Sequence, residues 1–235
     1  MSTRKGCGSV PEAIVAGADD RTGRVSATPV ARSPIAVPGP RSGVGRWEVS
    51  TRRSSAPLRL ADASPLAKVS IRADVDGAFA AALGVRFRHS RRENDVLTIG
   101  SGPGEWLLIG APDTAPGLSD QVRALAAGEF VTTVDLTHGR ALMRLSGRAA
   151  AQALSKVCAV DLAEATTPEG TAFRSSVAKV TTDVVRDDAG AATGEPSYLL
   201  HCERSTGQYL FECLLDAGKE FGVEPAGSDL TREGV

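Results

Sequence analysis

The chain has 235 residues, of which 42% are apolar, and a formal net charge of −1 at pH 7. This length and apolar content suffice for one ample domain or two small ones with a real core. No apolar run approaches the roughly 20 residues that a bilayer crossing needs, so no membrane span is predicted. Two positive charges near the start have no apolar block after them, unlike a secretory signal, and we expect a cytoplasmic protein.

The charge is distributed unevenly along the chain. Residues 1–60 hold ten Lys and Arg against four Asp and Glu, whereas residues 61–235 hold 17 against 24. A basic arm of this kind can contact nucleic acid or an acidic protein face. Its charges are scattered singly and lack interleaved aromatic residues, which favours a solvated tail, and we expect no nucleic-acid partner.

Residues 1–63 are predicted to form a disordered basic extension. Trp47 is their only aromatic residue, no helical or alternating apolar pattern is sustained, and the stretch PVARSPIAVPGPRSG contains four prolines. Order is expected to begin near Ser64. The predicted body spans residues 64–225, in halves of about 64–129 and 130–225, and a flexible tail follows at 226–235.

The first half is predicted to contain two strand regions and two helices. Asp74 is placed to cap the first helix, and Gly84 can adopt the left-handed conformation that ends it. The turn sequence GSGPG is typical of a hairpin. In order, the elements are a strand around 69–71, a helix at 75–83, a hairpin of 96–99 and 105–110, and a helix at 118–126.

The second half repeats this alternation of strands and helices. Its predicted elements are strands at 130–136 and 140–146, a helix around 150–158, strand-like sequence at 173–185, a strand at 198–203, and a helix at 210–221 capped by Ser205 or Thr206. Hairpins between strands suit antiparallel sheets better than a doubly wound parallel sheet. The sequence therefore predicts an α+β fold, and two ferredoxin-like halves would fit it.

The cysteines are predicted to be reduced packing residues. The nearest pair, Cys202 and Cys213, is eleven residues apart, whereas a structural zinc site usually has two ligands only two to four residues apart. Cys158, Cys202 and Cys213 all stand among apolar neighbours, where a buried thiol is inert. We therefore expect no metal site.

GSGPGE at residues 100–105 superficially resembles a phosphate-binding glycine loop. Glu105 stands where the dinucleotide fingerprint needs its third glycine, and a strand follows instead of a helix. A carboxylate at that position would also repel phosphate. The motif is interpreted as a hairpin turn.

DLTHGR at residues 135–140 is the densest polar cluster of the predicted body. Asp135, His138 and Arg140 could hold an anion or a substrate carboxylate. The favoured alternative is that Asp135 and Arg140 pair across a tight turn while His138 bonds to the backbone. His201 and His89 lack a partner that the sequence can identify, and no nucleophile with local support lies nearby, so no catalytic residue is predicted.

Several motifs together resemble the gamma subunit of heterotetrameric sarcosine oxidase. The resemblance covers about residues 64–222, and it departs from the family at Thr137, where serine is usual, and at Gly104, where an acid is usual. The motifs are Ser64-Pro65-Leu66-Ala67, GPGEWLLIG at 102–110, DLTHGR, RLSGRAA at 144–150, Cys158-Ala159-Val160-Asp161-Leu162, and a terminal helix with Arg204-Ser205 and Tyr209-Leu210.

This resemblance implies a non-catalytic subunit with a fold similar to the folate-binding domain of aminomethyltransferases. It implies alpha, beta and delta partner subunits, with alpha as the main contact. The complex of that family converts sarcosine to glycine and hydrogen peroxide, and the one-carbon unit leaves as formaldehyde or methylenetetrahydrofolate. FAD, FMN, NAD and tetrahydrofolate are expected on the partners and none on this chain. A free-standing folate-binding one-carbon transferase remains the alternative.

A docking surface is the positive role that we expect for such a subunit. Trp106 and Tyr209 are its candidate anchors, because exposed aromatic residues concentrate binding energy at interfaces. Simple packing in the core is the competing interpretation for both residues.

Overall fold

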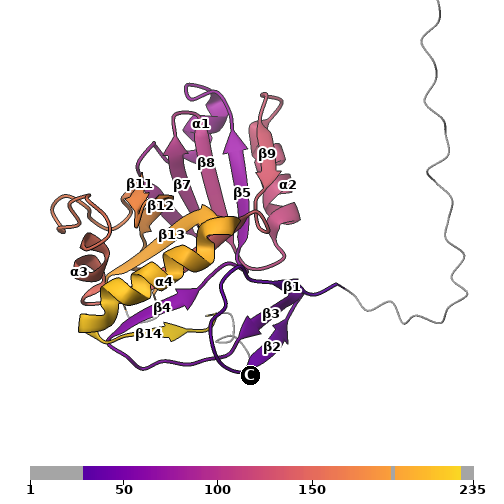
Figure 1. The fold of residues 1–235 in the computed structure, drawn as a ribbon. Coiled ribbons are helices and arrows are strands. Elements are labelled where there is room, and N and C mark those ends of the chain that lie inside the picture. Colours follow the sequence, from indigo (N-terminus) through magenta and orange to yellow (C-terminus); the bar gives the residue numbers. More distant parts are fainter. Residues whose placement is uncertain (1–28, 192–193, 229–235) are drawn as a thin grey trace, which may run out of the picture.

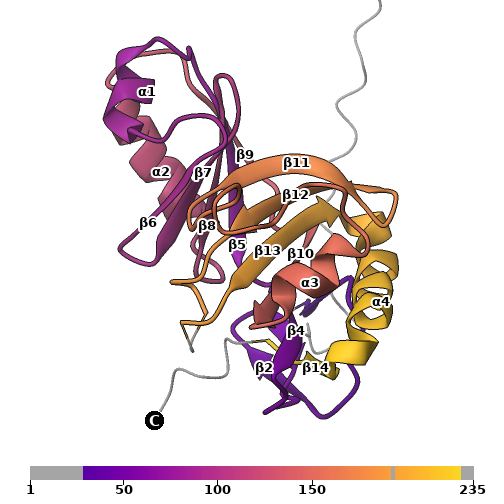
Figure 2. The same cartoon turned by 90° about the vertical axis from the view of Figure 1, so that its left-hand side faces the viewer.

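Two β-sheets packed face to face, with helices on both outer faces, form the body of the molecule (Figure 1, Figure 2). The computed structural model describes residues 29–191 and 194–228. The predictions made for residues 1–28 and 229–235 lie outside these described residues. The α+β architecture with mainly antiparallel sheets confirms the predicted fold class.

The first sheet has five strands and the strand order of a ferredoxin-like fold. In spatial order they are β6 (Ser90–Glu93), β7 (Val96–Gly102), β8 (Glu105–Gly110), β5 (Ala67–Arg72) and β9 (Thr132–Asp135). Every neighbouring pair is antiparallel. Helices α1 (Ala78–Leu83) and α2 (Ala115–Ala126) cover one face, where they share a buried cluster with Val69, Ile71 and Trp106.

The second sheet has six strands and incorporates a strand from the amino-terminal part of the chain. In spatial order they are β11 (Ala172–Val177), β12 (Val180–Arg186), β13 (Ser197–Glu203), β10 (Arg140–Gly147), β4 (Leu58–Asp62) and β14 (Val223–Ala226). Strand β4 takes the place beside β10 that β14 would occupy in an unmodified ferredoxin-like half. Strand β14 pairs in parallel with β4 at the edge.

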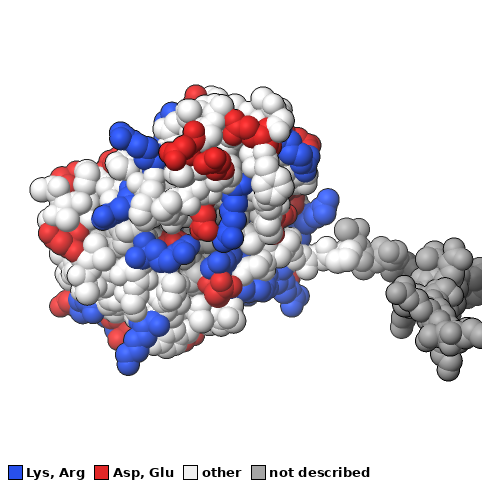
Figure 3. All heavy atoms as spheres, turned by 90° about the horizontal axis from the view of Figure 1, so that it is seen from above, with Lys and Arg blue, Asp and Glu red and all other residues white. Residues whose placement is uncertain are grey.

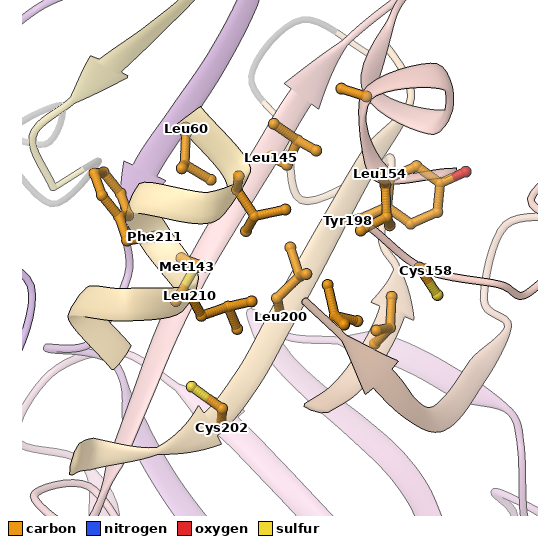
Figure 4. Packing of buried hydrophobic residues seen from close by; sticks show 14 of the residues in the cluster. Leu60, Met143, Leu145, Leu154, Cys158, Tyr198, Leu200, Cys202, Leu210 and Phe211 are labelled. Atoms are coloured by element: carbon orange, nitrogen blue, oxygen red, sulfur yellow. The ribbon is translucent and has the colours of Figure 1, made fainter. Parts of the chain in front are cut away.

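Helices α3 (Ala150–Ser155) and α4 (Gly207–Gly218) cover the outer face of the second sheet, with short 3-10 turns at Arg204–Thr206 and Lys219–Phe221 on either side of α4. The apolar face of α4 is the one that the sequence predicts. Leu210 and Phe211 lie against Met143 and Leu60 of the sheet (Figure 4). All four side chains are at most 2% exposed, so this contact is a dry core.

The inner faces of the two sheets also bury apolar side chains against each other. Alternate residues of the central strands point into this space, and they form one cluster: Leu97, Ile99, Leu107, Ile109, Leu142, Ala172, Val185 and Leu199. Each sheet is therefore covered on both faces. Side chains, and not a cavity, occupy this part of the space between the sheets.

Residues 29–63 are structured, contrary to the prediction of a disordered extension through residue 63. A three-stranded sheet contains β1 (Ala31–Arg32), β3 (Trp47–Ser50) and β2 (Arg41–Val44), and it is drawn at the lower right of Figure 1. Trp47 is 1% exposed, and Ile35 and Val37 join the core cluster of the second sheet. The apolar residues are too widely spaced for a periodic pattern, but Ile35, Val37 and Trp47 are buried by distant parts of the chain.

Other boundaries also differ from the predicted ones. Strand β9 pairs with β5, so it belongs to the first sheet and not to a half that begins at residue 130. At the other end, the predicted tail at 226–235 begins too early, because Gly227 and Ser228 donate backbone hydrogen bonds to the carbonyl oxygens of Arg52 and Ser50. Within the described residues no helix is long and apolar enough to cross a membrane.

Two tight turns and one helix start were also missed. Asn94-Asp95 and Ala178-Lys179 both have positive φ angles and close the β6–β7 and β11–β12 hairpins. No element was predicted just before residue 96, and residues 173–185 were predicted as one strand-like stretch. Helix α1 begins after Gly77, not after Asp74, and the carboxylate of Glu129 accepts the Phe79 N–H. The positive φ of Gly84 at its end is as predicted.

Substitution of Leu200 by alanine tests the importance of the second-sheet core. Leu200 is fully buried, whereas Leu125 on α2 is 42% exposed. We expect Leu200→Ala to lower the free energy of unfolding by about 2–5 kcal/mol, because it removes apolar contacts and leaves a cavity. Leu125→Ala should change it by less than about 1 kcal/mol. Urea denaturation of both variants measures the difference, and equal losses would contradict the assigned core.

Candidate functional site

The DLTHGR segment forms the crossing from the first sheet to the second. Strand β9 ends at Asp135 and β10 begins at Arg140. The Asp135 carboxylate accepts the backbone N–H of Thr137 at 2.8 Å, and the Thr137 hydroxyl accepts the N–H of Lys68 at 3.0 Å. These contacts hold the turn against β5, the strand next to β9.

Arg140 does not pair with Asp135, which corrects the favoured prediction. Its guanidinium lies 2.8 Å from the carboxylate of Glu203, the residue directly opposite it on β13. The cross-strand register explains this choice, because opposed residues of an antiparallel pair bring their side chains closest together. Sequence spacing alone cannot show this register.

His138 contacts the amino-terminal sheet instead of an open anion site. Its ring stacks on the Trp47 indole with ring centres 4.8 Å apart and an angle of 14° between the planes. Arg204 donates to the carbonyl oxygens of His138 at 3.3 Å and of Arg32 at 3.0 Å. The polar cluster therefore joins the small sheet to the two main sheets.

The two aromatic candidates for docking have different environments. Trp106 is 4% exposed, donates its indole N–H to the Val85 carbonyl at 2.7 Å, and meets Phe79 edge to face. It is a core residue within this chain. Tyr209 on α4 is 51% exposed and lines a shallow groove with Lys156 and Cys213, so it is accessible to a partner.

A buried polar cluster that sequence analysis did not single out lies at one end of the space between the sheets. Lys68 is 0% exposed, and its ammonium donates to the carbonyl oxygens of Ser64 and Leu66, both at 2.7 Å. Burial lowers the pKa of Lys68 to about 7, against the attraction of Asp62 and Asp135. Burial also raises the pKa of the Asp62 carboxyl.

His201 is buried in the same inter-sheet space. Its Nδ1 lies 3.4 Å from the carboxylate of Asp183 on the neighbouring strand, and its Nε2 is buried without a hydrogen-bond partner among the described residues. Burial lowers the pKa of His201 more than the contact with Asp183 raises it. Arg174 also binds Asp183, at 2.6 Å. His201 thus pairs across the sheet, whereas Glu203 points to Arg140.

A second buried ion network is centred on Asp187, which follows β12. Asp187 accepts from Arg92 at 2.6 Å and from Arg144 at 2.7 Å, and Arg144 also donates to the Ser197 hydroxyl at 2.7 Å. Although burial opposes ionisation, the two guanidinium groups lower the pKa of Asp187. Removal of one member would leave an uncompensated buried charge at a cost of about 3–5 kcal/mol.

These buried clusters stabilise charges and fix the packing of the two sheets, but none of them contains an activated nucleophile. Cys158 and Cys202 are buried, and burial raises the pKa of the Cys202 thiol, which disfavours the reactive thiolate. Cys213 is half-buried on α4. Within residues 29–191 and 194–228, no group of three or more His, Cys, Asp or Glu side chains is placed to hold a metal ion.

The chain belongs to the GCVT N-terminal domain family, whose model matches residues 89–232, more than half of the sequence. It is similar to the sarcosine oxidase subunit gamma of Corynebacterium sp. (strain P-1), with 32% identity over 124 residues. That alignment covers 53% of this chain and 57% of the relative, so the chain matches less than two thirds of the relative's length.

Two solved structures share this fold. One is heterotetrameric sarcosine oxidase from Corynebacterium sp. U-96 in complex with pyrrole 2-carboxylate, with a TM-score of 0.61, 22% identity, and coverage of 74% of this chain and 90% of that one. The other is glycine cleavage system aminomethyltransferase T from Bartonella henselae, with a TM-score of 0.62, 18% identity, and coverage of 80% and 56%. The resemblance to the sarcosine oxidase gamma subunit and the predicted fold are confirmed.

Substitution of Lys68 by methionine tests the buried ammonium through the pH dependence of stability. Because the pKa of Lys68 is about 7 in the folded chain and 10.5 for an exposed lysine, the unfolded chain binds more protons between these values. Wild-type stability should therefore rise with pH above 7, by roughly 1 kcal/mol per pH unit relative to Lys68→Met. Urea denaturation at several pH values measures the slopes, and parallel slopes would contradict the assignment.

Substitution of Trp47 by alanine tests the attachment of the amino-terminal sheet. Strands of two to four residues bury too little apolar surface to be stable on their own, so this sheet depends on packing against the main body. We expect Trp47→Ala to increase the rate of proteolytic cleavage between residues 31 and 50 by about tenfold or more, with the two main sheets intact. Arg32→Ala in the same sheet is the control. Limited proteolysis with mass spectrometry gives the result, and unchanged cleavage would show that the Trp47 contact does not hold the sheet.

Proposed function

We propose that this chain is the non-catalytic gamma subunit of a heterotetrameric sarcosine oxidase and acts in assembly and stability. The observation that carries the proposal is the 32% identity to a sarcosine oxidase subunit gamma. The order of the motifs from Ser64 to the terminal helix supports it. In this proposal the complex converts sarcosine to glycine and hydrogen peroxide in the cytoplasm, and its one-carbon unit leaves as formaldehyde or methylenetetrahydrofolate.

The partners in this proposal are the alpha, beta and delta subunits, with alpha as the main contact. FAD, FMN, NAD and tetrahydrofolate would be bound by these partners. The interior of the chain favours a supporting role, because apolar side chains and paired charges fill the space between the sheets. Such a body is a rigid surface for other subunits, and its two sheets, the second of which includes β4, form one functional unit.

Co-purification tests this role. The tagged full chain is co-expressed with the alpha, beta and delta subunits, and the eluate is assayed for flavin absorbance and sarcosine-dependent peroxide. We expect the flavoprotein and the activity to elute with the tag, and the chain expressed alone to give neither. Peroxide production from sarcosine by the isolated chain, or failure to recover the flavoprotein, would overturn the proposal.

The alternative is a free-standing folate-binding protein of the one-carbon transferase type. The match to the GCVT N-terminal domain family over residues 89–232 is the observation that favours it. It predicts binding of a tetrahydrofolate to the isolated chain with a dissociation constant in the micromolar range, measured by calorimetry. An absence of binding would eliminate this alternative and leave the subunit role unaffected.

A further inference from the structure

An exposed aromatic residue stands between two unpaired arginines in the segment Arg86–Phe87–Arg88, here called the Arg86–Arg88 ridge. Phe87 is 49% exposed, and both arginines are exposed. Within the described residues neither guanidinium makes an ion pair or a hydrogen bond, although most other arginines of the body do. Tyrosine, tryptophan, phenylalanine and arginine are the residues enriched in the cores of protein interfaces.

The backbone of the ridge is held rigidly by both halves of the molecule. The Arg88 N–H donates to the Gly100 carbonyl of β7 at 3.0 Å, and the Arg88 carbonyl accepts from the Ala172 N–H of β11 at 2.9 Å. Gly100 allows this close approach, because a Cβ at that position would lie 2.2 Å from the Arg86 carbonyl oxygen. The backbone of the ridge is therefore already ordered, so the ordering cost of docking falls on the side chains alone.

Arg88 has a φ angle of +70°, which is uncommon for a residue with a side chain. Such a conformation persists only where the surrounding contacts impose it, and it is concentrated at functional positions. The hydrogen bonds to Gly100 and Ala172 impose it here. The strained backbone at Arg88 is thus held in place beside the exposed Phe87 ring and the two unpaired guanidinium groups.

A groove runs along each side of the ridge, and Phe87 lines both. The first lies beside α1, with Val75, Val85, Pro103 and Trp106 among its lining residues. The second lies towards β11 and includes Pro103, Val160 and Phe173. Val75 is 52% exposed, so the apolar surface extends from the ridge to the end of the first sheet at which β5 ends. Figure 3 looks onto this end and shows charged groups of both signs separated by uncharged surface.

The charges around the grooves favour an acidic partner at the ridge itself. Glu105 is paired with Arg72 at 2.9 Å, and Arg174 is paired with Asp183 at 2.6 Å. Among the acidic residues that line the two grooves, Asp76 beside α1 makes no ion pair in the described structure. The guanidinium groups of Arg86 and Arg88 are thus left for carboxylates of another molecule.

We propose that the Arg86–Arg88 ridge docks a segment of a companion subunit that carries apolar side chains for the grooves and carboxylates for the two arginines. This proposal rests on the subunit role proposed above and identifies the surface used. A second copy of the chain fits poorly, because a symmetric contact of ridge with ridge would place guanidinium groups against each other. A nucleic acid fits poorly too, because the grooves are lined mainly by apolar residues and their acidic residues repel phosphate.

Variants of the ridge, assayed in the co-expressed complex, test this surface. We expect Phe87→Ala and Arg86→Glu each to lower the amount of flavoprotein recovered with the tagged chain by about tenfold or more. Two controls of the same residue types change exposed groups outside the grooves: Phe130→Ala, at a residue 89% exposed, and Arg46→Glu, between β2 and β3. The controls should stay within about twofold of the wild type. Circular dichroism and thermal unfolding verify that all variants are folded.

The possible outcomes distinguish failure of the proposed docking surface from failure of the proposed subunit role. Wild-type recovery by both ridge variants overturns the ridge and leaves the subunit role in place, whereas failure of the wild-type chain to recover the flavoprotein overturns both. Equal losses in the ridge variants and the controls also overturn the ridge. Two further results would overturn the proposed docking surface. In each, Phe87→Ala leaves flavoprotein recovery unchanged but abolishes another association, either a homodimer of the chain or its binding to a single-stranded DNA oligonucleotide.

Discussion

Contact between the inner faces of the two sheets is the constraint on which the rest of the structure depends. Each sheet is covered by helices on its outer face and by the other sheet on its inner face, so apolar residues of the central strands are buried whichever way they point. Lys68, Arg144 and Asp187 point into this shared interior, where an unpaired charge would be costly. The carbonyl oxygens around Lys68 and the guanidinium groups around Asp187 satisfy them and also limit how the sheets can shift.

Local sequence signals predicted many elements of the fold but not the partners of their residues. The turn GSGPG, the terminal glycine of α1 and the apolar stripe of α4 each depend on neighbouring residues, and all three are found. The alternation around Val69 and Ile71 correctly predicted a strand. Lys68, on the opposite face of this strand from Val69 and Ile71, is fully buried although it is charged. One strand's pattern cannot show that a second sheet covers its polar side.

The remaining errors have a common physical origin in long-range contacts. Arg140 pairs with Glu203 because of strand register, and Trp47 is buried because His138 lies against it. Neither contact produces a periodic pattern of apolar residues in the sequence. The Ala178-Lys179 turn lacks the Asn-Gly or Asp-Gly pair that usually marks such a turn. Asn94-Asp95 is a weaker form of this turn signal, and it could have been used to predict the β6–β7 hairpin. Of the five residues predicted for an interface or polar cluster, Trp106 belongs to the core, and the ridge that contains Phe87 was not singled out.

The position of β4 has a consequence for the order in which the chain can fold. This strand leaves the ribosome before either main sheet exists, and its two neighbours are β10 and the carboxy-terminal β14. One of its hydrogen-bonding edges must wait for β10, and the other must wait for β14, when nearly the whole polypeptide has been synthesised. Pairings between such distant segments are slow to form and expose strand edges to aggregation in the meantime. Synthesis close to a companion chain or a chaperone would protect these edges during the delay.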